Sequence, residues 1–242
     1  MTPHAADIFD LIDRSWPPEA MRRDGIWVIR QDSSGSKRTM AASLAPGANE
    51  DTAPAEIEQA EVAMTALDQP MLFQIRGPSG PLDQALGERG YRIVDPCTIY
   101  AIRAEALAAP VPHATAWSLW EPLAIQKEIW AEGGIGPGRL AIMERAGAPK
   151  TSIIGRVNDR AAGAAFVSGA GSLAMIHGVE TLADYRRKGV ARWMMVAACN
   201  WCIENGIDWL TLITVNDNLA ANALYTSIGM TPVGQYHYRI RD

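Results

Sequence analysis

A short basic segment, Arg186-Arg187-Lys188-Gly189-Val190-Ala191, has the composition of an anion-binding loop. It follows an apolar run at residues 173–179 and opens a helical pattern of apolar residues at 189–205. The first backbone N–H groups of a helix have no partner inside the helix, and the helix dipole adds positive charge there. Gly189 lets the backbone approach a bulky ligand. The segment therefore predicts a phosphate site, although taken alone it also fits an ordinary basic loop before a helix.

A second block of residues follows further along the chain. It lies on a helical pattern at residues 218–228 and at the start of the next strand, and consists of Asn218, Ala221, Leu224, Tyr225, Gly229 and Met230. Together, the patterns Arg-x-x-Gly-x-Ala and Asn-x-x-Ala-x-x-Leu-Tyr-x-x-x-Gly-Met resemble the GNAT superfamily of acyl-CoA-dependent N-acetyltransferases. The resemblance covers about residues 115–242, with the signature in 177–230.

This resemblance implies a binding site for acetyl-CoA. The basic loop would cradle the pyrophosphate, and the end of the strand at residues 173–179 would pair its backbone with the pantetheine arm. The strands that hold Val179 and Val215 would splay apart, with the thioester in the cleft between them. The residues implied in coenzyme binding are Gly178, Val179, Arg186, Arg187, Lys188, Gly189, Val190, Ala191, Asn218 and Ala221.

Attack of an amine on a thioester needs an oxyanion stabiliser, an acid for the leaving thiolate and a base for the amine. A backbone N–H near Val179 suits the first task. The resemblance implies Tyr225 as the acid, since a phenol of pKa about 10 can protonate a thiolate of pKa about 8.5. Glu180 and His177 are the candidate bases, and strand alternation places His177 on the face of Val179 and Glu180 on the other. A core tyrosine, a structural histidine and a loop-capping glutamate are the competing interpretations.

The C-terminal half predicts an α/β protein of the GNAT fold, with a mixed, mostly antiparallel sheet flanked by helices. Its first apolar runs are separated by short turn clusters, which is typical of an antiparallel meander. The expected elements are strands at residues 150–157, 162–168, 173–179, 207–215 and 230–240, and helices at 122–131, 138–146, 189–205 and 218–228.

The N-terminal half repeats the end of this plan. When Gly90 is aligned with Gly229, an offset of 229 − 90 = 139, a strand, a helix, a glycine and a strand recur in one register. The repeated elements are strands at residues 71–75 and 91–103 and a helix at 82–89. Upstream, the expected elements are a hairpin of residues 27–30 and 38–44 and a helix at 55–67.

The N-terminal copy lacks the residues of a coenzyme site. At the same offset the basic loop falls on Gly47-Ala48-Asn49-Glu50-Asp51-Thr52, and Tyr225 falls on Leu86. An acidic loop repels a pyrophosphate, and a leucine donates no proton. We therefore expect residues 1–108 to form a degenerate GNAT-like domain, either a scaffold or one wall of the acceptor pocket. Residues 115–242 are expected to form the acetyltransferase domain.

Composition and charge argue against several other classes. With 22 Lys and Arg against 27 Asp and Glu, the net charge of −5 disfavours nucleic acid or an anionic membrane as a partner. No apolar run is long enough to span a membrane, and residues 1–10 lack the pattern of a signal peptide. The three cysteines cannot all pair, and Cys199-x-x-Cys202 has no second ligand pair. A reducing, cytoplasmic location and the absence of a metal are expected.

We therefore expect an enzyme that moves an acetyl group from acetyl-CoA to the primary amine of a small-molecule or peptide acceptor, by direct attack in a ternary complex. Two alternatives are a non-catalytic sensor that binds coenzyme A and an acyltransferase with a longer acyl or an aminoacyl donor. The chain is expected to be a monomer or a homodimer.

Overall fold

The largest element of the fold is an eight-stranded sheet. The computed structural model describes residues 2–241, and the strand order is β4-β11-β5-β10-β9-β8-β7-β6, with a separate small sheet β1-β2-β3. The strands are β1 (Ala20–Asp24), β2 (Trp27–Gln31), β3 (Ser43–Leu44), β4 (Met71–Arg76), β5 (Arg92–Arg103), β6 (Ala116–Leu119), β7 (Lys150–Val157), β8 (Arg160–Ala170), β9 (Leu173–Thr181), β10 (Trp209–Val215) and β11 (Thr231–Arg241). The α-helices are α1 (Ala5–Ser15), α2 (Lys37–Met40), α3 (Ile57–Ala66), α4 (Pro81–Glu88), α5 (Ala104–Leu107), α6 (Ala124–Glu132), α7 (Pro137–Arg145), α8 (Val190–Glu204) and α9 (Leu219–Ser227), and the 3-10 helices are Glu50–Glu56 and Ala183–Tyr185.

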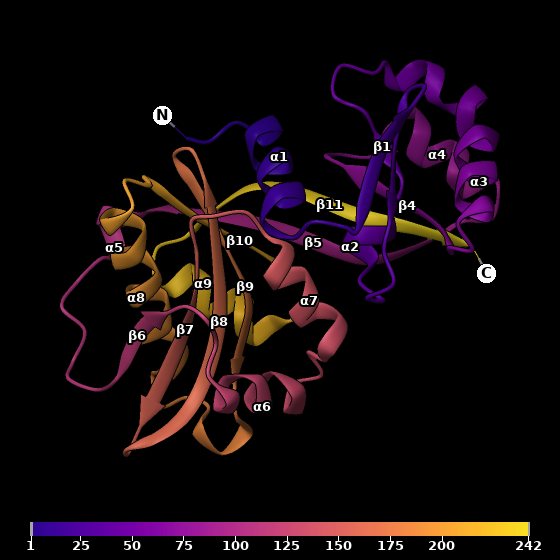
Figure 1. Cartoon of the computed structure of the whole chain (residues 1–242). Helices are drawn as coiled ribbons and strands as arrows, with labels where there is room; N and C mark the ends of the chain where they lie inside the picture. The colour runs from indigo at the N-terminus through magenta and orange to yellow at the C-terminus, as the bar shows by residue number, and fades with distance from the viewer. Residues whose placement is uncertain (1, 242) are drawn as a thin grey trace.

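Helices cover both faces of the C-terminal part of this sheet (Figure 1). The alternating side chains of β8 show the division. Ala165 and Val167 belong to the core under α8, whereas Ala164 and Phe166 belong to the core under α6 and α7. The strands β7, β8 and β9 form the predicted antiparallel meander, and β10 joins β9 in parallel. The predicted fold class, a mixed and mostly antiparallel sheet flanked by helices, is confirmed.

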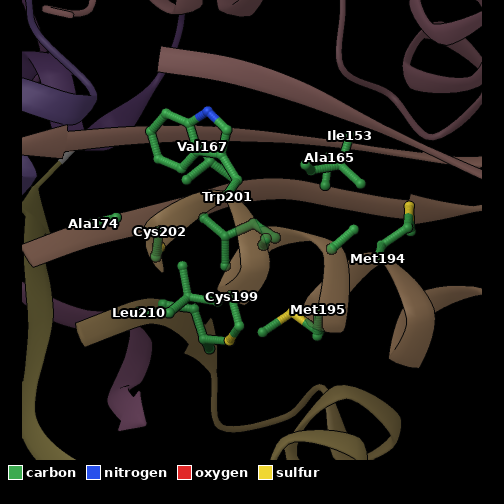
Figure 2. Close-up of a cluster of buried hydrophobic side chains, with 14 of the residues drawn as sticks. Ile153, Ala165, Val167, Ala174, Met194, Met195, Cys199, Trp201, Cys202 and Leu210 are labelled. Carbon is green, nitrogen blue, oxygen red and sulfur yellow. The ribbon is translucent and has the colours of Figure 1, made fainter. Parts of the chain in front are cut away.

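Figure 2 shows part of the core between α8 and the sheet, where sulfur-containing side chains of the helix pack against aliphatic side chains of the strands. It includes Met194, Met195, Cys199 and Cys202 of the helix and Ile153, Ala165, Val167, Ala174 and Leu210 of the strands. Burial raises the pKa of both thiols, that of Cys199 to about 12, so they stay protonated at neutral pH. Within residues 2–241 no group of three or more His, Cys, Asp or Glu side chains is arranged to hold a metal ion.

The two halves of the chain exchange strands. The last strand, β11, lies between β4 and β5 of the N-terminal half, and β5 in turn lies between β11 and β10. Figure 1 shows β5 and β11 running side by side from one half into the other. The registers repeat at the offset found in the sequence, because Arg76 pairs with Tyr236, Val215 pairs with Cys97, and 215 − 76 = 236 − 97 = 139. The four strands β4-β11-β5-β10 thus have the symmetry of an internal repeat.

The hairpin predicted upstream is confirmed only in part, by the strand at Trp27–Gln31 and its antiparallel pairing with Ser43–Leu44. β2 pairs along its whole length with β1, and the expected second strand is mostly the short helix α2, with only Ser43–Leu44 paired to β2. The hydroxyls of Ser34 and Thr39 both donate to the Asp32 carboxylate, which curls the chain into α2. β1 is exposed at four of its five positions, so it lacks the apolar alternation by which a strand is recognised.

Close packing of α8 on the sheet depends on Gly163 of β8. A Cβ atom added there would lie 2.8 Å from Met194 Cε and 2.9 Å from the backbone oxygen of Glu180. The methionine could move aside, but the oxygen of β9 could not. We therefore expect Gly163→Ala to lower the free energy of unfolding by about 1–3 kcal/mol, measured by chemical denaturation. Gly147→Ala is the control, because no atom lies within 4 Å of a Cβ there, and equal losses in both variants would contradict the prediction.

Candidate functional site

The sheet opens between β9 and β10. Parallel pairing between the two strands ends at Ile176 and Leu212, although β9 continues to Thr181 and β10 to Val215. On its other side β9 stays paired to β8 as far as Thr181. The two strands therefore diverge, and one edge of β9 is left without a strand partner. This is the splay expected for the strands of Val179 and Val215.

A β-bulge at Gly178 shapes the free edge of β9. The three-residue step from His177 to Glu180 opposes a step of only two residues on β8. Gly178 adopts the left-handed conformation, with φ of +54°, and Trp130 Nε1 of α6 donates a 2.8 Å hydrogen bond to its carbonyl oxygen. The extra residue turns Glu180 onto the same face as His177. The prediction of opposite faces is wrong, because simple alternation fails across a bulge.

Two cavities meet at this opening. The outer cavity, of about 640 Å³, lies beside the start of α8. Eight of the predicted coenzyme-binding residues line it: Val179, Arg186, Arg187, Gly189, Val190, Ala191, Asn218 and Ala221. Of the remaining two, Lys188 is exposed next to it, and Gly178 lines the second cavity.

The start of α8 is open to an anion. Its N-cap is Gly189, in the left-handed region with φ of +81°, and no side chain caps the helix. The side chains of Arg186, Arg187 and Lys188 are exposed around it. By contrast, α9 is capped by its own Asn218, whose Oδ1 accepts a 3.1 Å hydrogen bond from the backbone N–H of Ala221. Uncapped N–H groups, the helix dipole and three basic side chains together fit a pyrophosphate.

The inner cavity, of about 390 Å³, is lined largely by residues that the sequence analysis did not single out. Many of them come from the N-terminal half and from β11, and include Trp16, Ser36, Arg38, Asp95, Cys97, Tyr236 and Tyr238. They carry no local motif, and those of β5 and β11 lie on the two strands that the halves exchange. One signal could have located part of this group: Cys97 and Tyr236 are equivalent at the offset of 139, and they pair with each other.

Tyr225 lies in the wall shared by the two cavities. Its side chain is 6% exposed, and its ring centroid lies 6.1 Å from that of Tyr100. Burial, together with the negative charge of Glu180, raises the pKa of the phenol to about 12. Within residues 2–241 the hydroxyl has no hydrogen-bond partner. It therefore keeps its proton at neutral pH and is free to donate it.

Glu180 lies at the far end of the bulge and lines the outer cavity. Its side chain, 22% exposed, lies against Gly133 at the end of α6 and 3.6 Å from Arg186 Nη2. Burial raises the pKa of the carboxyl group, and the Arg186 charge partly offsets that rise. A carboxylate with a raised pKa is a stronger base than an exposed one.

His177 has both ring nitrogens engaged. Nδ1 lies 3.1 Å from Arg38 Nη1, and Nε2 lies 2.9 Å from Ser15 Oγ. An arginine can only donate, so Nδ1 must accept and Nε2–H donates to Ser15. Burial and the charge of Arg38 hold the pKa of the imidazole well below its usual range. The only lone pair of this neutral ring is thus directed at Arg38, which favours Glu180 over His177 as the base.

The equivalent place in the N-terminal half is occupied by the chain itself. The Glu50 side chain lies against Gly80, the N-cap of α4, and Leu86 is fully buried. At the offset of 139, Glu50 corresponds to Gly189 and α4 corresponds to α9, so an acidic side chain lies where the outer cavity has the glycine that begins α8. Its negative charge would repel a phosphate.

The fold and the site define an α/β acyltransferase, and comparison with known proteins agrees. A model of the acetyltransferase (GNAT) family matches residues 114–230. The uncharacterized N-acetyltransferase YobR of Bacillus subtilis (strain 168) is 29% identical over 245 residues, covering 94% of each chain. A GCN5-related N-acetyltransferase from Kribbella flavida superposes with a TM-score of 0.77 at 19% identity, covering 100% of this chain and 97% of its own. A tandem GNAT protein from the clavulanic acid biosynthesis pathway has a TM-score of 0.62 at 13% identity, covering 97% and 87%.

Residues 114–230 belong to the acetyltransferase (GNAT) family, as the sequence motifs indicated. The protein is an enzyme that transfers an acyl group from acyl-CoA to an acceptor. No helix in residues 2–241 is long and apolar enough to cross a membrane.

Proposed function

We propose that the protein moves an acetyl group from acetyl-CoA to a primary amine by direct attack in a ternary complex. The observation that carries this proposal is the pair of cavities, which share Val179, Asn218, Ala221 and Tyr225. A donor in the outer cavity and an acceptor in the inner cavity would meet at this shared wall. Direct transfer needs no nucleophile from the protein. The Cys97 thiol of the inner cavity is not activated, because burial raises its pKa.

Acetyl-CoA would enter the outer cavity along the start of α8. The pyrophosphate would accept hydrogen bonds from the N–H groups that follow Gly189 and pair with Arg186, Arg187 and Lys188. The free edge of β9 at Gly178 and Val179 would hold the pantetheine arm as an added strand. Acetyl-CoA supplies the activated acyl group, and the chain's own residues bind, orient and move protons.

In the chemical step, the amine nitrogen bonds to the thioester carbonyl carbon and the carbon–sulfur bond breaks. A backbone N–H at Val179 would stabilise the negative charge that develops on the carbonyl oxygen. The Tyr225 hydroxyl would give its proton to the leaving sulfur. Glu180 would accept the proton of the amine through a water molecule, because it lines the outer cavity and not the inner one. One proton is thus given and one accepted.

The N-terminal half, residues 1–108, would act as one wall of the acceptor pocket, and residues 115–242 would carry the coenzyme site. Residues of α2 and β5 line the inner cavity, which supports this division of labour. Because β5 and β11 are exchanged, neither half would complete its sheet alone.

Titration calorimetry with acetyl-CoA tests the first step. We expect the protein to bind acetyl-CoA, and Arg187→Glu to weaken binding by about tenfold or more, since a charge-assisted hydrogen bond contributes roughly 1.5–3 kcal/mol. Arg160→Glu is the control, because Arg160 is equally exposed but lies outside both cavities.

Three results would argue against the proposed function. Absence of binding at millimolar acetyl-CoA would defeat it outright. Binding without thioester consumption in the presence of any amine of a broad panel would instead support a coenzyme sensor. Faster turnover with a longer acyl-CoA than with acetyl-CoA would show that the transferred group is the longer acyl chain and not acetyl.

A further inference from the structure

Arg38 is a cation of the inner cavity that lacks a counter-ion. It lies in α2, and its side chain lines the cavity. Its Nη1 donates a 3.1 Å hydrogen bond to His177 Nδ1, whereas its Nε is buried without a hydrogen-bond partner. Among the described residues no carboxylate forms an ion pair with it. A charge taken out of water is costly unless it is paired, so this arginine is left short of an anion.

The groups that face Arg38 are neutral. They are the phenols of Tyr236 and Tyr238 and the thiol of Cys97. Burial raises the pKa of all three, so each remains protonated at neutral pH. None of them can compensate the guanidinium charge.

The remaining charges of the inner cavity add to this imbalance. Asp95 is the one acidic residue among those that line it, and its Oδ2 lies 2.7 Å from Lys37 Nζ. Arg139 lines the cavity too, exposed at its rim, and it forms no ion pair with the part of the chain that the structure describes. With Asp95 already paired to Lys37, the cavity keeps the positive charges of Arg38 and Arg139.

We propose that the acceptor amine also carries a carboxylate, which binds Arg38, and that the acceptors are free amino acids. This inference rests on the proposed function, because it concerns the acceptor of the same reaction. A guanidinium presents two parallel N–H donors that match the two oxygens of a carboxylate. His177, which Arg38 contacts, directly precedes Gly178 of the bulge. The carboxylate site therefore adjoins the reacting centre. In a free amino acid the amine and the carboxylate are only a few bonds apart, so both groups can reach their sites at once.

A purely structural role for Arg38 is the competing explanation. Its guanidinium lies 5.9 Å from the centre of the Trp16 ring, and its bond to His177 ties α2 to β9. A structural arginine would affect every acceptor equally, whereas a carboxylate-binding arginine would affect only acceptors that carry the carboxylate.

Matched acceptors separate these explanations in the wild-type protein. At saturating acetyl-CoA, thioester consumption is measured with each common L-amino acid, with its carboxamide and with its decarboxylated amine. We expect kcat/KM to be about 10–100-fold higher for the free acids than for both neutral partners, as expected for one charge-assisted pair. Equal or faster transfer to the amides and simple amines would overturn the inference and leave the proposed acetyl transfer to amines standing. Failure to bind acetyl-CoA at all would instead contradict the proposed function itself.

Variants of Arg38 assign the preference to this residue. Arg38→Met keeps much of the length and volume of the side chain but removes its charge, and Arg38→Lys keeps the charge but loses the forked donors. For the free acids we expect a loss of about 10–100-fold in kcat/KM in the methionine variant and a smaller loss in the lysine variant. The loss with the amides should be much smaller than the loss with the acids, and the affinity for acetyl-CoA should stay within about twofold of wild type, because Arg38 does not line the outer cavity. Arg160→Met is the control for removing an arginine outside the cavity.

Equal losses with acids and amides in a folded Arg38→Met protein would show that the arginine is structural, and would overturn the inference. If the methionine variant does not fold, the lysine variant and the wild-type comparison of acids with amides still decide the question.

Discussion

Replacing Tyr225 with phenylalanine is expected to lower kcat by about 10²–10⁴-fold, the usual contribution of a general acid. The substitution removes one hydroxyl and keeps the ring that packs near Tyr100. The hydroxyl has no hydrogen-bond partner within residues 2–241, so its loss leaves no unpaired group behind. The equilibrium constant for unfolding, measured by chemical denaturation, should therefore stay within about twofold of wild type. The Kd for acetyl-CoA, measured by titration calorimetry, should stay within the same range.

Tyr100→Phe is the matched control. It removes a phenolic hydroxyl from the neighbouring buried ring, and that hydroxyl donates a 2.9 Å hydrogen bond to Asn222 Oδ1. This variant should lose stability, by about 1 kcal/mol, but little turnover. A Tyr225→Phe enzyme that keeps kcat within about threefold of wild type would remove the acid role from this residue.

The pH dependence follows from the raised pKa of Tyr225. An acid must be protonated to act, and a pKa of about 12 keeps the phenol protonated through the neutral and moderately alkaline range. A fall of kcat with rising pH near 8 or 9 would therefore have to come from another group. The burial that raises the pKa also makes the phenol a weaker acid. The proton is therefore transferred only as negative charge develops on the leaving sulfur.

The parts of the site that local sequence determines were predicted, and the parts that depend on long-range strand pairing were not. Gly189 starts α8 and Asn218 caps α9, and each does so through contacts with residues a few positions away. Such residues leave a signal in the order of types along the chain. The strands of the C-terminal half were found in the same way, from apolar runs bounded by turn residues.

No local sequence signal of this kind predicted the positions of Arg38, Tyr236 and the Glu180 side chain. Tyr236 reaches the inner cavity on β11, one of the two exchanged strands, and Arg38 reaches it on α2, where it contacts His177 far along the chain. Periodicity says on which face of a strand a side chain lies, but not which strand is its neighbour. The direction of Glu180 depends on one extra residue at the Gly178 bulge, held by a hydrogen bond from a distant helix. One inserted residue reverses every alternation that follows it.

Replacing Glu180 with glutamine is expected to lower kcat/KM for the acceptor by about 10²–10⁴-fold at pH 7, the usual contribution of a general base. The amide has nearly the shape of the carboxyl group but cannot accept the amine proton. Burial makes the ionised carboxylate unfavourable in the folded protein, and glutamine relieves that penalty. The variant should therefore be as stable as wild type at pH 7, measured by chemical denaturation, and a loss of rate in it cannot be attributed to unfolding.

The pH profile distinguishes Glu180 from His177 as the base. A base must be deprotonated, so kcat/KM in wild type should rise with pH through the pKa of Glu180, and burial moves that rise above the ordinary range of a glutamate. Arg186→Met removes the nearby positive charge, so the pKa of Glu180 should increase and the rise in rate should shift to higher pH at saturating acetyl-CoA.

Glu180→Gln should abolish the rise. His177→Gln should weaken binding of the acceptor, because it removes a partner of Arg38, but it should keep the rise in rate with pH. The one lone pair of the imidazole already accepts a hydrogen bond from that arginine and so cannot take a proton from the amine. A rise that disappears in His177→Gln and persists in Glu180→Gln would make the histidine the base.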